Sequence, residues 1–146
     1  MRTTIAKIAL LAALLGSNVA AAEALYRAKV DQRNPNGKDL VIEFEELKRN
    51  PKTSLVKTIY KSGASVPSAM FIVRGMYEIA RERGSRYFIK LKEWKSDDGA
   101  SMMLVGFCDD KNVDPTTYFS LSEKLPASDE NAFLSVANYD ILFRPR

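Results

Sequence analysis

Two glutamates in this sequence have the spacing of a catalytic carboxylate pair. Glu43 and Glu45 lie two residues apart on a predicted strand, so their side chains stand about 6.5–7 Å apart on one face, inside the range of paired glycosidase carboxylates. Such pairs normally flank a cleft from two different elements, whereas charged neighbours on a solvent-facing strand are common. We expect Glu43 to pair with Lys29 or Arg27 across a hairpin, which makes catalysis here the weaker interpretation.

Two further motifs match known sites only in part. Residues 110–114 (DKNVD) have the oxygen spacing of a calcium loop, but Pro115 stands where the loop needs glycine and Leu121 where it needs a bidentate Glu. Ser54 and Lys57 match the Ser-x-x-Lys motif of penicillin-binding enzymes, but no SDN or KTG partner follows. We therefore expect a solvated acidic loop and a chance match, and the sequence predicts no metal and no cofactor.

The amino-acid composition excludes several classes of chemistry. The 146 residues include no histidine and one cysteine, Cys108. A Ser-His-Asp or Cys-His nucleophile, a histidine zinc site, an internal disulfide and a CxxC pair are therefore excluded. We expect Cys108 to be buried and inert, with an intermolecular disulfide as the alternative, because no histidine is present to activate the thiol.

The first 22 residues have the pattern of a cleaved secretory signal peptide. Arg2 and Lys7 form a basic region, residues 8–15 (IALLAALL) an apolar run, and Ala20 and Ala22 a small-residue cleavage site. The apolar run is about half of the ~20 residues that a membrane-spanning helix needs, so we expect no transmembrane segment after cleavage. The predicted location is outside the cytoplasm, either periplasmic or secreted.

Removal of the signal peptide also changes the charge of the chain. The full sequence has 22 Lys and Arg against 18 Asp and Glu, a net charge of +4, and cleavage removes two basic residues and no acid. The resulting net charge of +2 on residues 23–146 argues against the concentrated basic patch that nucleic-acid binding requires. We expect no nucleic-acid partner and one domain over residues 23–146. Cleavage of the signal peptide after Ala24 is the alternative to cleavage after Ala22.

The rest of the sequence predicts strands on either side of one helix. Alternating or β-branched residues predict five strands, at residues 24–31, 39–47, 54–60, 86–95 and 100–108. Residues 68–83 have an apolar stripe at helical spacing and end at Gly84, which suits a left-handed C-cap. Gly75 weakens this helix by up to ~1 kcal/mol relative to alanine, and a close approach to a strand would explain it.

The C-terminal part of the chain leaves its secondary structure open. Residues 118–122 could form a strand. We favour a short helix over residues 129–138, capped by Ser128, followed by a strand. One long strand through Phe143 is the alternative, so residues 129–143 could be helix, strand or both.

The predicted strands at 86–95 and 100–108 present two apolar faces. We assign to the helix the almost wholly apolar face that consists of Tyr87, Ile89, Leu91, Met102, Leu104, Gly106 and Cys108. The opposite face, which we call the outer hairpin face, consists of Phe88, Lys90, Lys92, Trp94, Ser101, Met103, Val105 and Phe107. A slip of one residue in the register would exchange part of this assignment.

The outer hairpin face is the candidate binding surface, because it is too apolar to be left bare. Its predicted binding residues are Phe88, Lys90, Lys92, Trp94, Met103, Val105 and Phe107. The favoured interpretation is that the C-terminal segment covers the apolar side chains while the lysines reach the rim. The alternative is a protein partner or a second copy of the chain.

Basic residues are frequent between positions 74 and 95, and glutamates are interleaved with them. Arg74 and Glu78, for example, are four residues apart on the predicted helix. This pattern favours a solvent face of ion pairs. Contact with an anionic lipid or polysaccharide of the cell envelope is the alternative.

One stretch of the chain resembles a known group of proteins. Residues 76–84 (MYEIARERG), followed by the aromatic pair Tyr87 and Phe88, echo a helix, a glycine and an aromatic strand in that order. On this pattern residues 62–90 resemble part of a group of small uncharacterised bacterial envelope proteins, many of them lipoproteins, although this chain lacks their lipid-bearing cysteine. The resemblance implies a fold with one helix on a sheet and an envelope location, and it implies no activity.

These patterns together predict an α+β fold, with a mostly antiparallel sheet of five or six strands packed on one central helix at about residues 68–83. We expect an exported, non-catalytic domain that binds a partner or supports the cell envelope. A small carboxylate-based enzyme and a self-assembling structural protein are the alternatives. A pocket with convergent carboxyl groups of shifted pKa would favour the enzyme, and a flat exposed aromatic face would favour binding or assembly.

Overall fold

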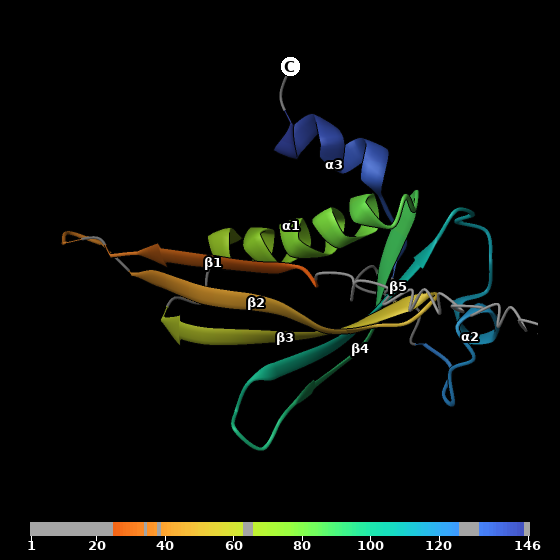
Figure 1. Cartoon of the computed structure of the whole chain (residues 1–146), viewed down its shortest axis with the longest axis horizontal. Coiled ribbons are helices and arrows are strands. Elements are labelled where there is room, and N and C mark those ends of the chain that lie inside the picture. Colours follow the sequence, from red (N-terminus) through yellow and green to blue (C-terminus); the bar gives the residue numbers. More distant parts are fainter. Residues whose placement is uncertain (1–24, 34, 38, 63–65, 126–131, 145–146) are drawn as a thin grey trace, which may run out of the picture.

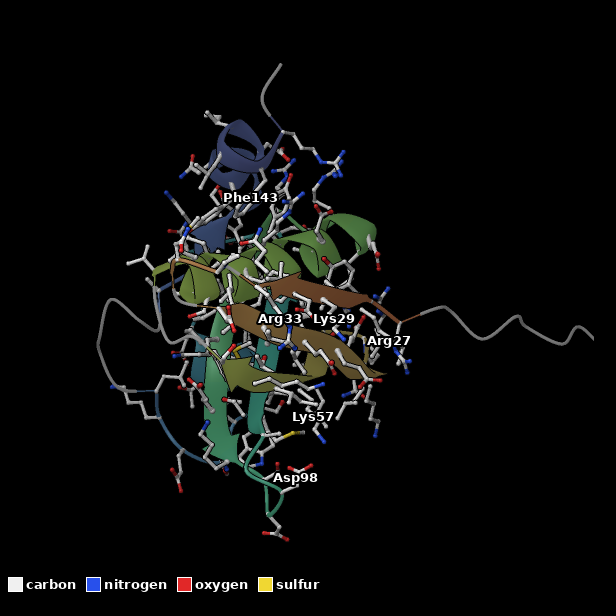
Figure 2. All side chains as sticks on the ribbon, turned by 90° about the vertical axis from the view of Figure 1, so that its left-hand side faces the viewer. Arg27, Lys29, Arg33, Lys57, Asp98 and Phe143 are labelled. Carbon is white, nitrogen blue, oxygen red and sulfur yellow. The ribbon has the colours of Figure 1, made fainter. Side chains whose placement is uncertain are left out.

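Figure 1 shows the computed structural model of the chain, which describes residues 25–33, 35–37, 39–62, 66–125 and 132–144. A curled antiparallel sheet lies below helix α1, and helix α3 lies on the other side of α1 (Figure 1). The same order of layers is visible in the perpendicular view (Figure 2). The predicted signal peptide lies outside the described residues.

The sheet has six strands and is antiparallel throughout. The strands are β1 (Arg27–Gln32), β2 (Leu40–Arg49), β3 (Thr53–Ser62), β4 (Tyr87–Lys95), β5 (Ser101–Cys108) and β6 (Leu134–Ser135). Their order across the sheet is β1-β2-β3-β5-β4-β6, and each neighbouring pair is antiparallel. The predicted α+β class and the mostly antiparallel sheet of five or six strands are therefore confirmed.

The hairpin of β1 and β2 follows the alternation of its sequence. Lys29 lies opposite Glu43 and Arg27 opposite Glu45, with ion pairs of 3.3 Å and 2.6 Å respectively. Figure 2 shows Arg27 and Lys29 in a row along β1. The prediction that Glu43 pairs across this hairpin is confirmed, and both glutamates are committed to cross-strand ion pairs.

Three helices complete the described chain: α1 (Val66–Glu82), α2 (Pro115–Tyr118) and α3 (Val136–Phe143). The predicted helix at 68–83 is confirmed, with its start two residues earlier. Gly84 ends α1 at a φ of 70°, a left-handed conformation that glycine adopts without strain, and Ser85 N–H donates to the Ala80 carbonyl at 2.9 Å. Ser135 caps α3 by accepting a hydrogen bond of 3.4 Å from Asn138 N–H.

The register of β4 and β5 differs from the predicted one near their turn. Ile89 lies opposite Gly106 as expected, but Lys95 lies opposite Ser101 instead of Ala100. The ladder shifts by one residue between Lys90 and Lys92, where Leu91 is the extra residue of a bulge. Beyond this bulge every side chain of β4 points to the face opposite to the predicted one.

The predicted assignment of one hairpin face to the helix is wrong. The buried cluster that contains Met76, Tyr77, Ile79 and Ala80 of α1 also contains Phe88, Met103, Val105 and Phe107. These four hairpin residues come from the predicted outer hairpin face. Both faces of the hairpin are apolar, so composition alone could not determine which of them would meet α1.

Gly75 lies at a close contact between α1 and strand β2. A Cβ atom at this position would lie 2.6 Å from Cζ of Phe44, which belongs to β2 and is buried. Phe44 in turn packs edge-on against Tyr26, with 5.8 Å between the ring centroids. The sequence-based explanation of Gly75, a close approach to a strand, therefore agrees with the contacts.

The opposite face of β5 is covered at one end by the chain that follows it. A Cβ atom at Gly106 would lie 2.6 Å from the ring of Phe119, which lies just after α2. The predicted strand at 118–122 is wrong, because α2 ends at Tyr118 and turns follow it. Cys108 is 4% exposed on this face of β5, so its predicted burial is confirmed.

The predicted order of helix and then strand at the C-terminus is also wrong. The two residues of β6 come first, opposite Tyr87 and Phe88, and α3 follows through Phe143. The proposed cap at Ser128 lies outside the described residues. Tyr139 and Phe143 pack against the buried cluster from α3, and Phe143 lies 5.2 Å from the ring of Tyr77. Tyr139 and Phe143 are four residues apart, slightly more than one helical turn, so both rings lie on the inner face of α3.

Candidate ligand-binding cleft

The floor of a cleft between α1 and the sheet is made by three neighbouring strands. Thr58 of β3 lies opposite Ser101 of β5, and both are buried. The bulge at Leu91 brings Glu93 opposite Met103 and Lys95 opposite Ser101, on the face that carries the buried cluster. The cleft therefore combines a polar floor with the apolar side of α1.

The cleft consists of two adjoining pockets. The first, which we call the apolar pocket, has a volume of about 320 Å³ and is lined by Thr58, Ala69, Ile72, Val73, Met76, Lys90, Glu93, Ser101, Met103, Ala132 and Leu134. The second, the polar pocket, has a volume of about 510 Å³ and is lined by Tyr60, Lys61, Ser62, Ser68, Glu93, Lys95 and Ser101. Glu93 and Ser101 line both, so the two pockets meet at these residues.

Glu93 forms a hydrogen-bonded group with two neighbours at this junction. Its Oε1 accepts a hydrogen bond of 2.9 Å from the Ser101 hydroxyl, and its Oε2 accepts one of 3.1 Å from the Lys90 ammonium. Partial burial acts to raise the pKa of Glu93, but these two hydrogen bonds hold it below its usual range. Glu93 is therefore an ionised acceptor at neutral pH and a weak base.

The polar pocket has two lysines near its tyrosine. Lys61 donates to Glu43 at 2.8 Å, whereas the Lys95 ammonium lies 5.8 Å from the centroid of the Tyr60 ring. Burial and the nearby Glu93 carboxylate raise the pKa of Tyr60, so its hydroxyl stays protonated and can donate a hydrogen bond. This end of the cleft is rich in donors.

The predicted binding residues of the outer hairpin face are divided by the structure. Phe88, Met103, Val105 and Phe107 are each at most 5% exposed and belong to the buried cluster. Lys90 lies at the cleft, next to Glu93. Beyond the bulge, Lys92 and Trp94 lie opposite Leu104 and Met102 on the other face of the sheet. The seven residues do not form one surface.

Trp94 and its neighbour Lys92 lie in the open on that other face. Trp94 is 38% exposed, and the Lys92 ammonium lies 5.7 Å from the centroid of its ring. The apolar residues of the outer hairpin face are instead covered from within the chain. Tyr139 of α3, for example, packs at 5.9 Å from Phe88.

The other chemical motifs of the sequence do not converge on the cleft. Ser54 is buried and donates to Glu46, whereas Lys57 points to the opposite face and forms an ion pair of 2.8 Å with Asp98. Figure 2 shows Lys57 and Asp98 close together at one end of the molecule. No group of three or more His, Cys, Asp or Glu side chains in the described residues is placed to hold a metal ion.

No pattern in the sequence indicated a buried charged cluster around Glu46. Its side chain is fully buried, and its Oε2 accepts hydrogen bonds from Arg49 Nη2 at 2.5 Å and from Tyr26 N–H at 3.2 Å. Its Oε1 accepts from Arg49 Nε at 2.8 Å and from the Ser54 hydroxyl at 2.5 Å. Four donors satisfy both oxygens, so this cluster holds β1, β2 and β3 together and leaves no position for a ligand.

The ion pairs that the basic segment predicted are present on α1 and β4. Arg74 and Arg81 lie 4.0 Å and 3.8 Å from Glu78, and Lys90 pairs with Glu93.

No helix of the described chain is long and apolar enough to cross a bilayer. Comparison of the sequence and the structure with protein-family models, characterised proteins and solved structures gives no match.

Proposed function

We propose that the protein is an exported, non-catalytic domain that binds a small ligand in the cleft between α1 and the sheet. The observation that carries this proposal is the apolar pocket, which has side chains of α1 on one side and a polar group at its end. Its volume of about 320 Å³ is at the lower end of the range for ligand sites, and a pocket with apolar walls and a few placed polar groups is typical of them.

The ionisation of the carboxyl groups favours binding over a carboxylate-based enzyme. Among the described residues, the pKa is shifted for five carboxyl groups, and all five shifts are downward: Glu43, Glu46, Glu93, Asp98 and Asp114. A general acid of a glycosidase type needs a raised pKa. Glu93 in the cleft is shifted in the wrong direction for that role.

The burial of four residues of the outer hairpin face weakens the proposal of self-assembly through it. An aromatic face can join two copies only where it is exposed, and Trp94 is the one aromatic residue of the seven that is. The cleft replaces that face as the proposed place of binding. An envelope location follows from the signal peptide pattern and the resemblance of residues 62–90, and it remains part of the proposal.

The proposal also includes α1 as the central helix of the domain. It is supported by the buried cluster, to which α1 and the four strands β2, β3, β4 and β5 contribute, and by the position of Gly75 against Phe44. With α1 in that place, one wall of the apolar pocket consists of Ala69, Ile72, Val73 and Met76. A rigid helix then determines the shape of the pocket.

A fluorescent probe of neutral charge tests the cleft. Nile red should gain fluorescence on binding to the purified protein, and Ala69→Trp should weaken this binding at least about tenfold, because an indole would fill the apolar pocket. Val66→Trp is the matched control, since Val66 is also on the first turns of α1, is 78% exposed and lines neither pocket. Equal binding by Ala69→Trp and the unaltered protein would overturn the proposal.

Export has its own test, independent of the ligand. Protein recovered from outside the cytoplasm should begin at Glu23 or at Leu25 when its N-terminus is sequenced by mass spectrometry. An N-terminus at Met1 or Arg2 in that fraction would show that the segment is not cleaved.

A further inference from the structure

The two pockets of the cleft differ in chemistry and meet end to end. The apolar pocket is lined mainly by aliphatic side chains and the two methionines Met76 and Met103. The polar pocket contains four hydroxyl groups and two lysines, and Glu93 is the only carboxylate among its described lining residues. A ligand that occupies both pockets must therefore have an apolar part and a polar part.

The polar pocket has more donors than acceptors among its side chains. Both oxygens of Glu93 already accept hydrogen bonds, from Ser101 and Lys90. The Lys95 ammonium lies over the ring of Tyr60, forms no close ion pair with any described residue, and interacts with the Glu93 carboxylate only at longer range. A donor-rich pocket in which one ammonium has no carboxylate in direct contact attracts an acceptor group of negative charge.

We infer that the ligand is an amphiphile with a carboxylate head group. Its apolar tail lies in the apolar pocket, and its head lies in the polar pocket between Lys95 and the Tyr60 hydroxyl, at the end away from Lys90. This inference rests on the proposed function and adds the chemical class of the ligand. The ion pair of Glu93 with Lys90 reduces the repulsion that a second carboxylate would meet at the junction.

Three ligands with the same tail and different heads test the head group. Octanoate, octan-1-ol and octylammonium are compared by displacement of Nile red from the unaltered protein. We expect octanoate to bind about tenfold more tightly than octan-1-ol, which is the effect of one charge-assisted hydrogen bond, and octylammonium to bind most weakly. Added salt should weaken the binding of octanoate and leave the binding of octan-1-ol unchanged.

Two lysines of β4 provide a matched pair of variants. Lys95→Gln should reduce the affinity for octanoate about tenfold and leave that for octan-1-ol unchanged. Lys92→Gln is the control, because Lys92 also contacts an aromatic ring, at 5.7 Å from Trp94, but lies on the opposite face of the sheet. It should change neither affinity. Far-UV circular dichroism checks that both variants are folded.

The possible failures are distinguishable. Equal affinity for octanoate and octan-1-ol, or an equal loss of octanoate binding in both lysine variants, would overturn the carboxylate head group while the Ala69→Trp result still supports the cleft. Tightest binding of octylammonium would overturn it in favour of a cationic head at Glu93. Absence of Nile red binding to the unaltered protein would overturn the proposed function and this inference together.

Discussion

Replacement of Gly75 by alanine tests the packing of α1 on the sheet. Gly75 lies inside α1, where a glycine is less favourable than alanine by about 1 kcal/mol, so the change would stabilise a helix with a free surface. In this protein the new methyl group would lie 2.6, 2.7 and 2.8 Å from three carbon atoms of the Phe44 ring. These distances are well inside van der Waals contact, so one of the two elements must move.

The size of the effect follows from the freedom of Phe44. Its ring is only 1% exposed and is held edge-on by Tyr26, so it has little room to move away. Overpacking of a core by one methyl group costs about 1–3 kcal/mol. After subtraction of the helix gain of about 1 kcal/mol, we expect Gly75→Ala to lower the free energy of unfolding by up to about 2 kcal/mol.

Urea denaturation followed by far-UV circular dichroism measures this change, and a double-mutant cycle gives its control. Phe44→Leu removes the three ring atoms that Gly75→Ala would meet. In the Phe44→Leu background the alanine should therefore raise the free energy of unfolding, by about 1 kcal/mol. If Gly75→Ala is stabilising to the same extent in both backgrounds, α1 does not pack on β2 at this point and the reasoning is refuted.

Three further predictions concern single side chains. Trp94→Ala should lower the free energy of unfolding by about 1 kcal/mol or less because Trp94 is 38% exposed, whereas Phe88→Ala should lower it by about 3–5 kcal/mol because Phe88 is a fully buried aromatic. Urea denaturation measures both changes, and equal losses would contradict the register of β4. The Cys108 thiol should react slowly with a thiol reagent in the native protein and fast in denaturant, because it is 4% exposed and burial raises its pKa; equal rates would contradict its burial. Burial opposes the ionisation of Glu46, but hydrogen bonds from Arg49, Ser54 and Tyr26 N–H lower its pKa in the folded state. The stability that Glu46 contributes is therefore lost as the pH falls below about 4.3 and through the pKa of the folded state. The urea midpoint of Glu46→Gln should fall less steeply at acid pH than that of the unaltered protein, and parallel curves would contradict this role.

The elements that follow a simple periodicity could be predicted from the sequence. Apolar and charged residues alternate in the middle of β1 and β2, so a pairing of Glu43 with Lys29 or Arg27 could be inferred before the fold was known, and the structure places Glu43 opposite Lys29. Helix α1 has an apolar stripe, and Gly84 marks its end. In both cases the sequence has one apolar side, and only one arrangement buries that side.

The hairpin of β4 and β5 could not be assigned in the same way. Both of its faces are apolar: one shares a buried cluster with side chains of α1, and Phe119 lies against part of the other. The strands β3 and β4 run parallel with β5 between them, so the side on which α1 lies depends on how the chain crosses over β5. Local sequence carries no information on that crossing.

Charged side chains that become buried are equally difficult to predict. A glutamate on a strand next to other polar residues is expected in solvent, yet Glu46 is 1% exposed. Its burial requires Arg49, Ser54 and Tyr26 to meet at one point, and these come from three different strands or strand ends. Only the assembled sheet brings them together.

The bulge at Leu91 connects the fold to the proposed site. A regular ladder from Ile89 would have placed Lys92 and Trp94 on the face of the buried cluster and turned Glu93 and Lys95 to the opposite face. The extra residue reverses this alternation, so the indole lies in the open and two charged groups line the cleft. Bulges are frequent beside functional sites because they re-aim side chains without loss of the strand. Here one extra residue creates the polar pocket, and the chemistry of the cleft therefore depends on a feature of the backbone that the hydrophobic pattern of the sequence conceals.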